Sequence, residues 1–427
     1  MLNLMNKRVA ILLVALLSFG SVSAQDYRLL QERFLEAEYF FVMEEYAEAV
    51  INYLQVYSDM PENANIAFRI GICYLNISGK KDLSIKYLEA ASKNMSARHR
   101  EGSVRHLTAP YEALYELARA YRINFNFDKA IETFLLYKKT LLPNDIANHN
   151  FVDQEIKACE FAKTFISSPI SFTEENIGEL FNDEKSNFNP LISADGKTFV
   201  YMSSLKFYDA IMFSRLQDGK WSGPINIYPD LQIDGKISIS CLSKDGTTLF
   251  FSRIVNDNSD IYFSTFNGTT WAPAKMLNRN INTRYWESHA FLSEDGSSLV
   301  FASDRPGGFG GLDLYISTKI NGDWGPAINM GPTINTPFNE DRPFFTNNDN
   351  ALIFCSQGHN TMGGYDLFRS DKSNGVFGIP VNMGYPLNTP DDDTYFMPYG
   401  DGKSGYIFKE KESEGFGGND IYRIILK

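Results

Sequence analysis

The 427-residue chain is poor in the residues that most often carry metal and nucleophilic chemistry, with four cysteines and five histidines. The histidines are scattered without ligand spacing, and neither an HExxH nor a Gly-x-Ser-x-Gly motif occurs. Positive charge is also scarce, since 40 Lys and Arg stand against 52 Asp and Glu. The sequence therefore predicts no metal, no cofactor and no serine chemistry, and its acidic balance disfavours nucleic acid as a partner.

Long apolar runs are missing after the first 24 residues. Lys7 and Arg8 precede an apolar run from Val9 to Phe19, and small residues end the segment at Ser21-Val22-Ser23-Ala24. This pattern predicts a secretory signal peptide over residues 1–24. Residue 25 is Gln, so no cysteine stands there to carry a lipid. We expect a periplasmic protein without a membrane span, associated with the outer membrane through partners.

The few cysteines lie far apart in the sequence and form no CxxC pair. Two cross-links are possible in an exported protein. Cys73, Cys241 and Cys355, however, each lie inside an apolar stretch. The pattern favours buried free thiols that behave as small apolar side chains.

Residues 25–168 are predicted to form a helical domain of repeated helix pairs. Small and aromatic residues recur at tetratricopeptide offsets of 3, 9, 12, 16, 19 and 24 in a first unit: Ala37, Phe40, Tyr46, Ala49, Tyr53, Val56 and Pro61. A second unit starts at Gly71 and a third at Ala118, with an insertion near residues 94–108 between them. A last helix over about 149–165 is expected to cap the third pair. The small residues would let paired helices approach closely, and stacking would bury their faces.

The first helix of each pair would line the concave face of this tetratricopeptide solenoid. On that face we place a candidate binding groove, made of Glu38, Phe41, Phe68, Asn76, Arg119 and Arg122. An ordinary solvated helix surface is the alternative for each of them. Glu38 and Ile72 occupy positions where a carboxylate clamp would need Asn, so binding of chaperone tails is disfavoured.

From residue 169 onwards the periodicity changes to alternating strands. Ser-x-Asp-Gly recurs at 193–196, 243–246 and 293–296, and an aspartate precedes a later strand of each unit at Asp209, Asp260, Asp313, Asp366 and Asp420. Asp-Gly between alternating strands predicts a tight hairpin in which both central residues take positive φ. Five units of about 53 residues with four strands each predict a five-bladed β-propeller over residues 169–427.

The last unit lacks the closing Trp and the Asn-x-Gly motif of the other units. A matching motif occurs instead at Asn176-Ile-Gly178-Glu-Leu-Phe-Asn182, which aligns with Asn382-Met-Gly384-Tyr-Pro-Leu-Asn388 position by position. We therefore expect residues 170–182 to supply the missing outer strand as a latch that closes the ring.

One polar set recurs on the strand expected to line the propeller channel. Three residues before the position of Pro190 and Pro343, the units carry Asn187, Ile237, Glu287, Glu340 and Asp393. The polar members, Asn187, Glu287, Glu340 and Asp393, could bind a cation, a basic side chain or a sugar, or the carboxylates could act as acid and base. Packing and hydrogen bonding of the innermost strand is the alternative. For the Gly-rich text at 305–313 and 415–420, a structural turn is favoured over a calcium loop, because it recurs only once per unit.

The text Ser-x-Asp-Gly-x-x-Leu-x-Phe-x-Ser-x-Arg-Pro-Gly-Gly-x-Gly-Gly-x-Asp-Leu-Tyr, clearest at 293–315, resembles the WD40-like (PD40, TolB-type) repeats of periplasmic proteins. Tetratricopeptides followed by this propeller resemble a Bacteroidetes architecture, the N-terminal part of PorE-like, OmpA-family components of type IX secretion, without the OmpA-type domain. The resemblance implies a non-enzymatic periplasmic scaffold that binds envelope proteins, in type IX secretion or gliding. The alternatives are a glycoside hydrolase using Glu287, Glu340 or Asp393, and a carbohydrate-binding propeller.

Overall fold

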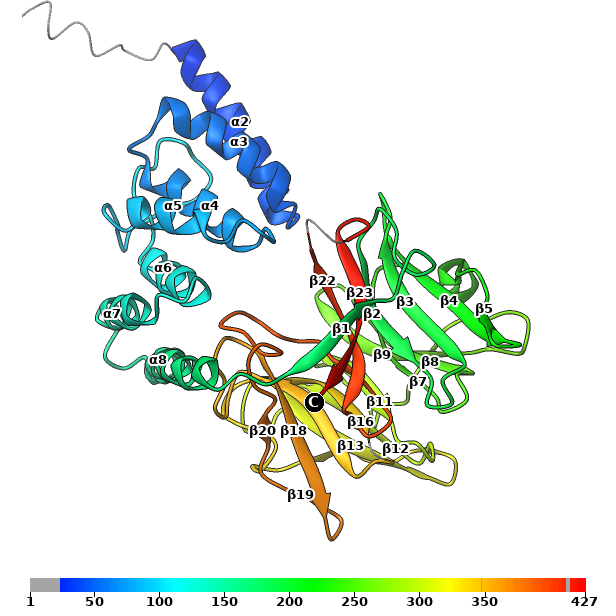
Figure 1. Cartoon of the computed structure of the whole chain (residues 1–427). Helices are drawn as coiled ribbons and strands as arrows, with labels where there is room; N and C mark the ends of the chain where they lie inside the picture. The colour runs from blue at the N-terminus through cyan, green and yellow to red at the C-terminus, as the bar shows by residue number, and fades with distance from the viewer. Residues whose placement is uncertain (1–23, 347, 412–414) are drawn as a thin grey trace, which may run out of the picture. The chain divides into compact units, whose positions relative to one another are not determined.

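The computed structural model describes residues 24–346, 348–411 and 415–427. The predicted signal peptide, apart from Ala24, lies outside these residues. The described chain forms two compact units, one up to Ala120 and one from Tyr121 to Lys427. Helices occupy its first part and strands its second (Figure 1). Among the described residues, no helix is long and apolar enough to cross a membrane.

The first unit contains four helices and most of a fifth, in the order α2 (Ala24–Val42), α3 (Tyr46–Asp59), α4 (Ala64–Leu75), α5 (Leu83–Ala91) and α6 (Glu112–Ile123). Consecutive helices from α2 to α5 pack on one another. Ala37, Ala49 and Ala91 are fully buried. A Cβ on Gly71 would lie 2.4 Å from Leu88 Cγ, so the close approach of α4 and α5 requires glycine there. Helix pairs are therefore present, and their stacking as a tetratricopeptide solenoid stays a prediction.

The second unit contains five antiparallel sheets, the five blades of a β-propeller. Four of them run in chain order: β2 (Asn187–Ile192), β3 (Thr198–Ser204), β4 (Asp209–Gln217), β5 (Lys220–Trp221) and β6 (Ile225–Asn226); β7 (Lys236–Leu242), β8 (Thr248–Val255), β9 (Asn258–Thr265) and β10 (Lys275–Met276); β11 (Glu287–Leu292), β12 (Ser298–Ser303), β13 (Asp313–Ile320), β14 (Asp323–Trp324) and β15 (Ile328–Asn329); and β16 (Glu340–Thr346), β17 (Ala351–Ser356), β18 (Asp366–Ser373), β19 (Val376–Phe377) and β20 (Val381–Asn382). A 3-10 helix, η1 (Tyr228–Leu231), links the first two sheets.

The fifth sheet takes its outer strand from before the first sheet. It contains β21 (Met397–Tyr399), β22 (Ser404–Glu410), β23 (Asn419–Leu426) and, at the outer edge, β1 (Phe172–Asn176). Strand β1 pairs antiparallel with β23, with Phe172 opposite Leu426 and Asn176 opposite Tyr422. The predicted outer position of this segment is thus observed.

A hydrogen-bonded pair of asparagines, which we call the asparagine bridge, explains why the same motif recurs at the outer strand of three sheets. Asn182 accepts a hydrogen bond from the Ile421 N–H at 2.8 Å, and its amide donates to Asn176 Oδ1 at 2.8 Å. The same two contacts join Asn335 to Leu314 and Asn329, and Asn388 to Leu367 and Asn382, all at 2.8 Å. The bridge ties the outer strand of each sheet to its third strand.

The Ser-x-Asp-Gly turns differ from the expected hairpin type. Only the glycine takes positive φ, as at Gly196 with 69°, and its N–H donates to the Ser193 carbonyl at 2.8 Å. The aspartate instead accepts from the residue two places on, since the Lys197 N–H lies 3.0 Å from Asp195 Oδ1. Two successive positive φ values occur one hairpin later, at Asp218 and Gly219 with 50° and 75°. The expectation for Asp-Gly was therefore wrong, because the side-chain bond holds the aspartate in a right-handed turn.

Two further helices belong to the same compact unit as the sheets: α7 (Phe127–Lys138) and α8 (Ile146–Ser167). The Gln154 amide on α8 donates to the His359 carbonyl at 3.2 Å. The rings of Phe151 and Phe338 lie 6.4 Å apart. Helix α8 therefore packs on propeller loops, and α7 packs on α8.

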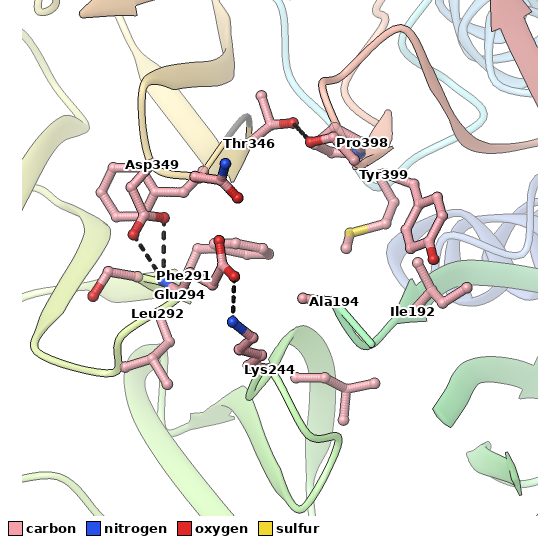
Figure 2. Close-up of a pocket in the computed structure, with 16 residues that line it drawn as sticks. Ile192, Ala194, Lys244, Phe291, Leu292, Glu294, Thr346, Asp349, Pro398 and Tyr399 are labelled. Carbon is pink, nitrogen blue, oxygen red and sulfur yellow. Dashed lines mark hydrogen bonds and ion pairs between the residues drawn. The ribbon is translucent and has the colours of Figure 1, made fainter. Parts of the chain in front are cut away.

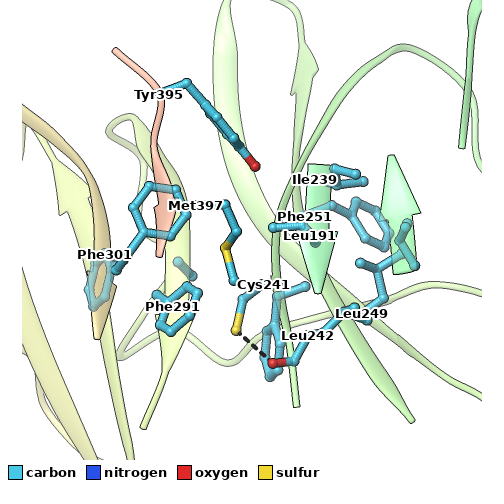
Figure 3. Close-up of a cluster of buried hydrophobic side chains, with 14 of the residues drawn as sticks. Leu191, Ile239, Cys241, Leu242, Leu249, Phe251, Phe291, Phe301, Tyr395 and Met397 are labelled. Carbon is cyan, nitrogen blue, oxygen red and sulfur yellow. Dashed lines mark hydrogen bonds between the residues drawn. The ribbon is translucent and has the colours of Figure 1, made fainter. Parts of the chain in front are cut away.

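The core of the propeller surrounds its central axis. Buried apolar side chains of neighbouring inner strands meet there, among them Leu191, Ile239, Phe291 and Met397 (Figure 3). All four cysteines are buried and free, in agreement with the expected buried thiols. Burial raises the pKa of Cys241 to about 12, so its thiol stays protonated at neutral pH.

Candidate functional site

A pocket of about 140 Å³ opens where the inner strands end at the Ser-x-Asp-Gly turns (Figure 2). All five sheets contribute to it. Its walls include apolar side chains of the inner strands, Ile192, Leu242, Phe291, Phe345 and Met397. Its polar lining comes from the turns, as Lys244, Glu294 and Asp349. We call this cavity the mouth pocket.

The polar side of the mouth pocket is a connected set of charges. Lys244 Nζ lies 2.5 Å from Glu294 Oε1, and this pair joins the turns of the second and third sheets. The Glu294 N–H donates to both oxygens of Asp349, at 2.9 and 3.1 Å. Burial raises the pKa of the Asp349 carboxyl, and the nearby Glu294 and Asp295 raise it further. The pocket thus combines an apolar wall with a rim of one cation and two carboxyl groups.

Deeper along the axis, polar side chains from several sheets contact one another. His289 Nδ1 lies 2.8 Å from Asp341 Oδ1, which joins the third and fourth inner strands. The Arg342 guanidinium lies 5.6 Å from the centre of the Tyr395 ring, and the Tyr395 hydroxyl donates to the Pro190 carbonyl at 2.6 Å. Burial would raise the pKa of Asp341, but the neighbouring His289 and Arg342 hold it below its ordinary value. These contacts link the inner strands β2, β11 and β16 to Tyr395, which precedes β21.

A β-bulge in each of three inner strands places side chains at this depth. The register shifts after Phe188, Ser288 and Asp341. The residue that directly follows each of these three has positive φ: Asn189, His289 and Arg342, with 49°, 46° and 47°. Bulges redirect side chains where a regular strand would not. Alternation along the strand therefore could not have predicted which residues meet there.

The channel carboxylates predicted from the sequence clamp the connections between sheets. Glu340 is fully buried, and its two oxygens accept from the Thr336 N–H at 2.8 Å and the Thr336 hydroxyl at 2.6 Å. Glu287 bonds Thr283 in the same way, with both contacts at 2.7 Å. Asp393 accepts from the Thr389 N–H. Carboxylates satisfied in this way by backbone amides suit a structural role.

Asn187 holds the equivalent place in the first sheet. Its side-chain oxygen accepts from the Asp183 N–H at 2.9 Å, and its amide donates to Ser203 at 3.1 Å. Asn187 is 1% exposed and Glu287 is not exposed at all. Ligand binding by this channel set therefore stays a prediction without support from the geometry.

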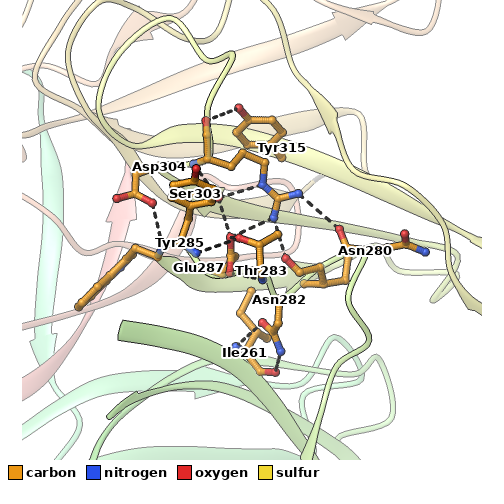
Figure 4. A network of polar contacts seen from close by, with 12 residues as sticks. Ile261, Asn280, Asn282, Thr283, Tyr285, Glu287, Ser303, Asp304 and Tyr315 are labelled. Carbon is orange, nitrogen blue, oxygen red and sulfur yellow. Dashed lines mark hydrogen bonds and ion pairs between the residues drawn. The ribbon is translucent and has the colours of Figure 1, made fainter. Parts of the chain in front are cut away.

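Figure 4 shows Glu287 beside Thr283 and Ser303. Arg305 completes the surroundings of Glu287. Its guanidinium lies 3.2 Å from Glu287 Oε1 and donates to the Ile281 carbonyl at 2.6 Å. It also stacks over Phe301 and Tyr315, at 5.0 and 4.9 Å from the ring centres. The arginine of the Arg-Pro-Gly-Gly motif thus neutralises the buried Glu287 carboxylate.

The Gly-rich loops that follow this arginine also pack within the protein. Asp313 accepts from the N–H groups of Phe309 and Gly310, at 2.6 and 3.0 Å. A Cβ on Gly310 would lie 1.8 Å from the Phe338 carbonyl oxygen, so the loop touches the connection that enters the next sheet. Among the residues that the structure describes, no cluster of three His, Cys, Asp or Glu has the arrangement of a metal site.

Burial of Glu340 predicts a dependence of stability on pH. Burial raises the pKa of Glu340 from its ordinary 4.5 to about 7. Because the folded value exceeds the unfolded one, this group contributes fully below pH 4.5, and its contribution is lost as the pH rises through 7. We expect wild type to lose about 2 kcal/mol more free energy of unfolding between pH 5 and 8 than Glu340→Gln. Urea unfolding followed by fluorescence measures this, with exposed Glu175→Gln as the control, and equal losses in wild type and Glu340→Gln would refute it.

In the first unit, two predicted groove residues meet around an arginine that sequence reasoning missed. Arg69 on α4 lies 3.1 Å from Glu38 Oε1 and 4.7 Å from the centre of the Phe41 ring. Glu38 also accepts from the Tyr53 hydroxyl. The Arg69 side chain is only 8% exposed, so this ion pair is largely desolvated.

The other groove candidates are not brought together. Phe68 is buried, and the exposed Asn76 caps α4 by donating to the Ile72 carbonyl at 2.9 Å. Arg119 pairs with Glu116 of its own helix at 2.9 Å.

Arg122 does not lie on an open face, and that expectation was wrong. Its side chain is 2% exposed and lies 2.5 Å from Glu155 on α8. Its Nε donates to the Pro390 carbonyl at 3.0 Å, in a propeller loop 268 residues away. Helical spacing could not show that α8 and a propeller loop bury Arg122.

Sequence reasoning also missed the mouth pocket. Lys244 and Glu294 are the second residues of Ser-x-Asp-Gly turns, and this variable position was the available signal. In the first sheet the same position is the exposed Ala194, which also lines the pocket.

No protein-family model matches the chain, and no curated protein matches it either. Among similar solved structures, TolB from Acinetobacter baumannii is 18% identical with a TM-score of 0.37, over 57% of this chain and 54% of that one. A family 117 glycoside hydrolase from Zobellia galactanivorans is 11% identical with a TM-score of 0.39, over 60% and 90%. The catalytic domain of the Coprinopsis cinerea GH62 α-L-arabinofuranosidase is 9% identical with a TM-score of 0.37, over 61% and 98%. Identities this low transfer no activity or partner.

Proposed function

We propose that the chain is a non-enzymatic periplasmic scaffold and that the mouth pocket binds a segment of a partner protein. The observation that carries the proposal is the pocket itself, an apolar wall with a charged rim at the end of the channel. Pockets of this kind hold an apolar anchor and orient it by a few polar groups. The finer assignment, to a type IX secretion or gliding assembly at the outer membrane, rests on the resemblance of the repeats.

The rim would select the partner by its charge. Lys244 is 60% exposed on its side chain and Glu294 is 30% exposed, so both can exchange their mutual contact for one with a ligand. Asp349 is held by the backbone of Glu294 and would add negative charge on one side. A partner segment with an apolar side chain next to a basic one fits this arrangement, because the carboxyl groups exceed the single cation.

Burial of the channel carboxylates argues against the hydrolase alternative. A glycosidase needs two carboxyl groups that face a substrate across an open space. Glu287 and Glu340 are fully enclosed and bonded to threonines of their own connections. The scaffold interpretation therefore accounts better for these residues.

Filling the mouth pocket tests the proposal. Ala194→Tyr adds a ring at the exposed rim of the pocket, and Ala147→Tyr, at an exposed site on α8, is the matched control. We expect Ala194→Tyr to lower recovery of specific cross-linked envelope partners by about tenfold, since it removes access for an anchor worth roughly 1–2 kcal/mol or more. Quantitative mass spectrometry of cross-linked envelope fractions compares the two with wild type.

Two outcomes would contradict the scaffold. Unchanged recovery with Ala194→Tyr would remove the mouth pocket from the binding site. Hydrolysis of envelope polysaccharides by wild type that disappears in Glu340→Gln would favour the enzyme instead.

A further inference from the structure

The insertion between α5 and α6 lies on the helices that were expected to form a binding face. Its residues 96–108 form no regular helix or strand. They cross the N-terminal parts of α2 and α4, where we define the α2–α4 face by Gln31, Asn63 and Arg69. All the contacts described below lie within the first unit.

Side-chain amides of the α2–α4 face hold the backbone of the insertion. Gln31 Oε1 accepts from the Val104 N–H at 3.2 Å, and Gln31 Nε2 donates to the Gly102 carbonyl at 3.4 Å. Asn63 Nδ2 donates to the Val104 carbonyl at 2.9 Å. Val104 and Arg105 are the central residues of a turn, because the His106 N–H donates to the Ser103 carbonyl at 3.1 Å. Amides that bond both the N–H and the C=O of one segment hold it in place whatever its side chains.

A single side chain anchors the insertion. Val104 is not exposed at all and packs in the same apolar cluster as Phe34 and Ile70. It is the one buried side chain among residues 96–108, all of which the structure describes. A segment with one buried anchor and otherwise accessible side chains contacts the domain as a bound peptide does.

Charged contacts flank the anchor on both sides. Glu101, three residues before Val104, lies 3.3 Å from Arg69 Nη2 and is 67% exposed. Arg105, the residue after the anchor, lies over the Tyr27 ring at 5.2 Å. Arg69 also holds Glu38, so it presents an ordered guanidinium to a carboxylate that solvent can reach.

We propose that residues 101–105 are an internal ligand, and that the α2–α4 face binds a partner segment with the same turn and the same chemistry in exchange for them. That segment carries a valine-sized anchor, a carboxylate three residues before it and a basic residue after it. The interaction is an exchange, because one site cannot hold both segments. The proposal extends the scaffold function to a second surface and does not depend on the mouth pocket.

Hydrogen exchange on the unaltered full chain tests the exchange of segments. If the insertion detaches locally, the Val104 amide exchanges at least about tenfold faster than the amides of Ile66 and Ile70 on α4. If all three exchange at one rate, the insertion opens only when the unit unfolds, and the proposal is overturned. This result does not depend on whether any variant folds.

A peptide of residues 98–108 labelled with fluorescein is the probe for direct binding. We expect full-length Val104→Gly, whose own anchor is removed, to bind it at least about tenfold more tightly than wild type, because the internal competitor is weakened. Adding Gln31→Ala should abolish that binding. Adding Asn52→Ala, which removes an amide that bonds Glu48 of its own helix, should leave it intact.

The peptide itself supplies the last control. A version with Val104→Asp should not bind, since a carboxylate would enter an apolar site. Equal binding of the probe to wild type and Val104→Gly would overturn the proposal, as would binding unaffected by Gln31→Ala. Ala194→Tyr should not alter this binding, so failure here and failure of the mouth pocket are separate results.

Discussion

Replacing β1, residues 172–176, by a Gly/Ser segment of equal length is expected to lower the melting temperature of the full chain by about 10 °C or more. The replacement removes a strand paired along its whole length with β23. It also removes Glu174, whose carboxylate lies 2.7 Å from Lys411 Nζ and also pairs with Lys409. The fifth sheet would then expose the edge of β23. Calorimetry of wild type and variant measures the effect.

Two asparagine variants distinguish the stability that comes from closing the ring from the stability that comes from one asparagine bridge. Asn182→Ala breaks the bridge that links β1 to β23, and Asn335→Ala breaks the same bridge within the third sheet. If β1 closes the ring, Asn182→Ala destabilises the chain at least as much as Asn335→Ala. A replacement of β1 that leaves the melting temperature unchanged would show that the strand is only an appendage.

Reversing the charge of Arg122 is expected to cost about 3–5 kcal/mol of stability. Arg122→Glu would place a carboxylate against Glu155 in a buried site and leave the Pro390 carbonyl without its donor. The matched control is Arg28→Glu, because Arg28 is 83% exposed and pairs only across one helical turn with Glu32. That change should cost about 1 kcal/mol or less.

Tryptophan fluorescence during urea unfolding suits this comparison. All four tryptophans, Trp221, Trp271, Trp286 and Trp324, lie in the same compact unit as Arg122. Equal midpoints for Arg122→Glu and wild type would show that the buried pair does not hold α6 and α8 to the propeller loops. The expected loss also means that charge reversal at Arg122 tests stability and not partner binding.

The propeller could be predicted from the sequence because the residues that recur in each unit make the same local contacts in each sheet. The asparagine bridge uses two asparagines six residues apart, so the same text appears wherever the same contacts form. This is why Asn176 and Asn182 could be assigned to the last sheet although they precede the first. The aspartates that begin β4, β13 and β18 could be located for the same reason.

The candidate site was less predictable because it depends on contacts between distant segments. Lys244 and Glu294 are 50 residues apart in the sequence and form an ion pair between two sheets. Repeat position showed that Glu287 and Glu340 are equivalent, but only the fold shows that each carboxylate faces its own connection and not the channel. Helical spacing likewise placed Arg122 on a face without showing what covers it.

The register of β1 against β23 has a mechanical consequence. Helix α8 ends at Ser167, so only a short connection separates it from Phe172 at the start of β1. Phe172 lies opposite Leu426, and therefore the α8 side of β1 and residue 427 emerge from the same end of the ladder. Tension between those two points would peel the pair apart one hydrogen bond at a time, and the bonds would not share the load as they do in shear. A pull applied between Ser168 and residue 427 is thus delivered to the ring at the strand that can yield first.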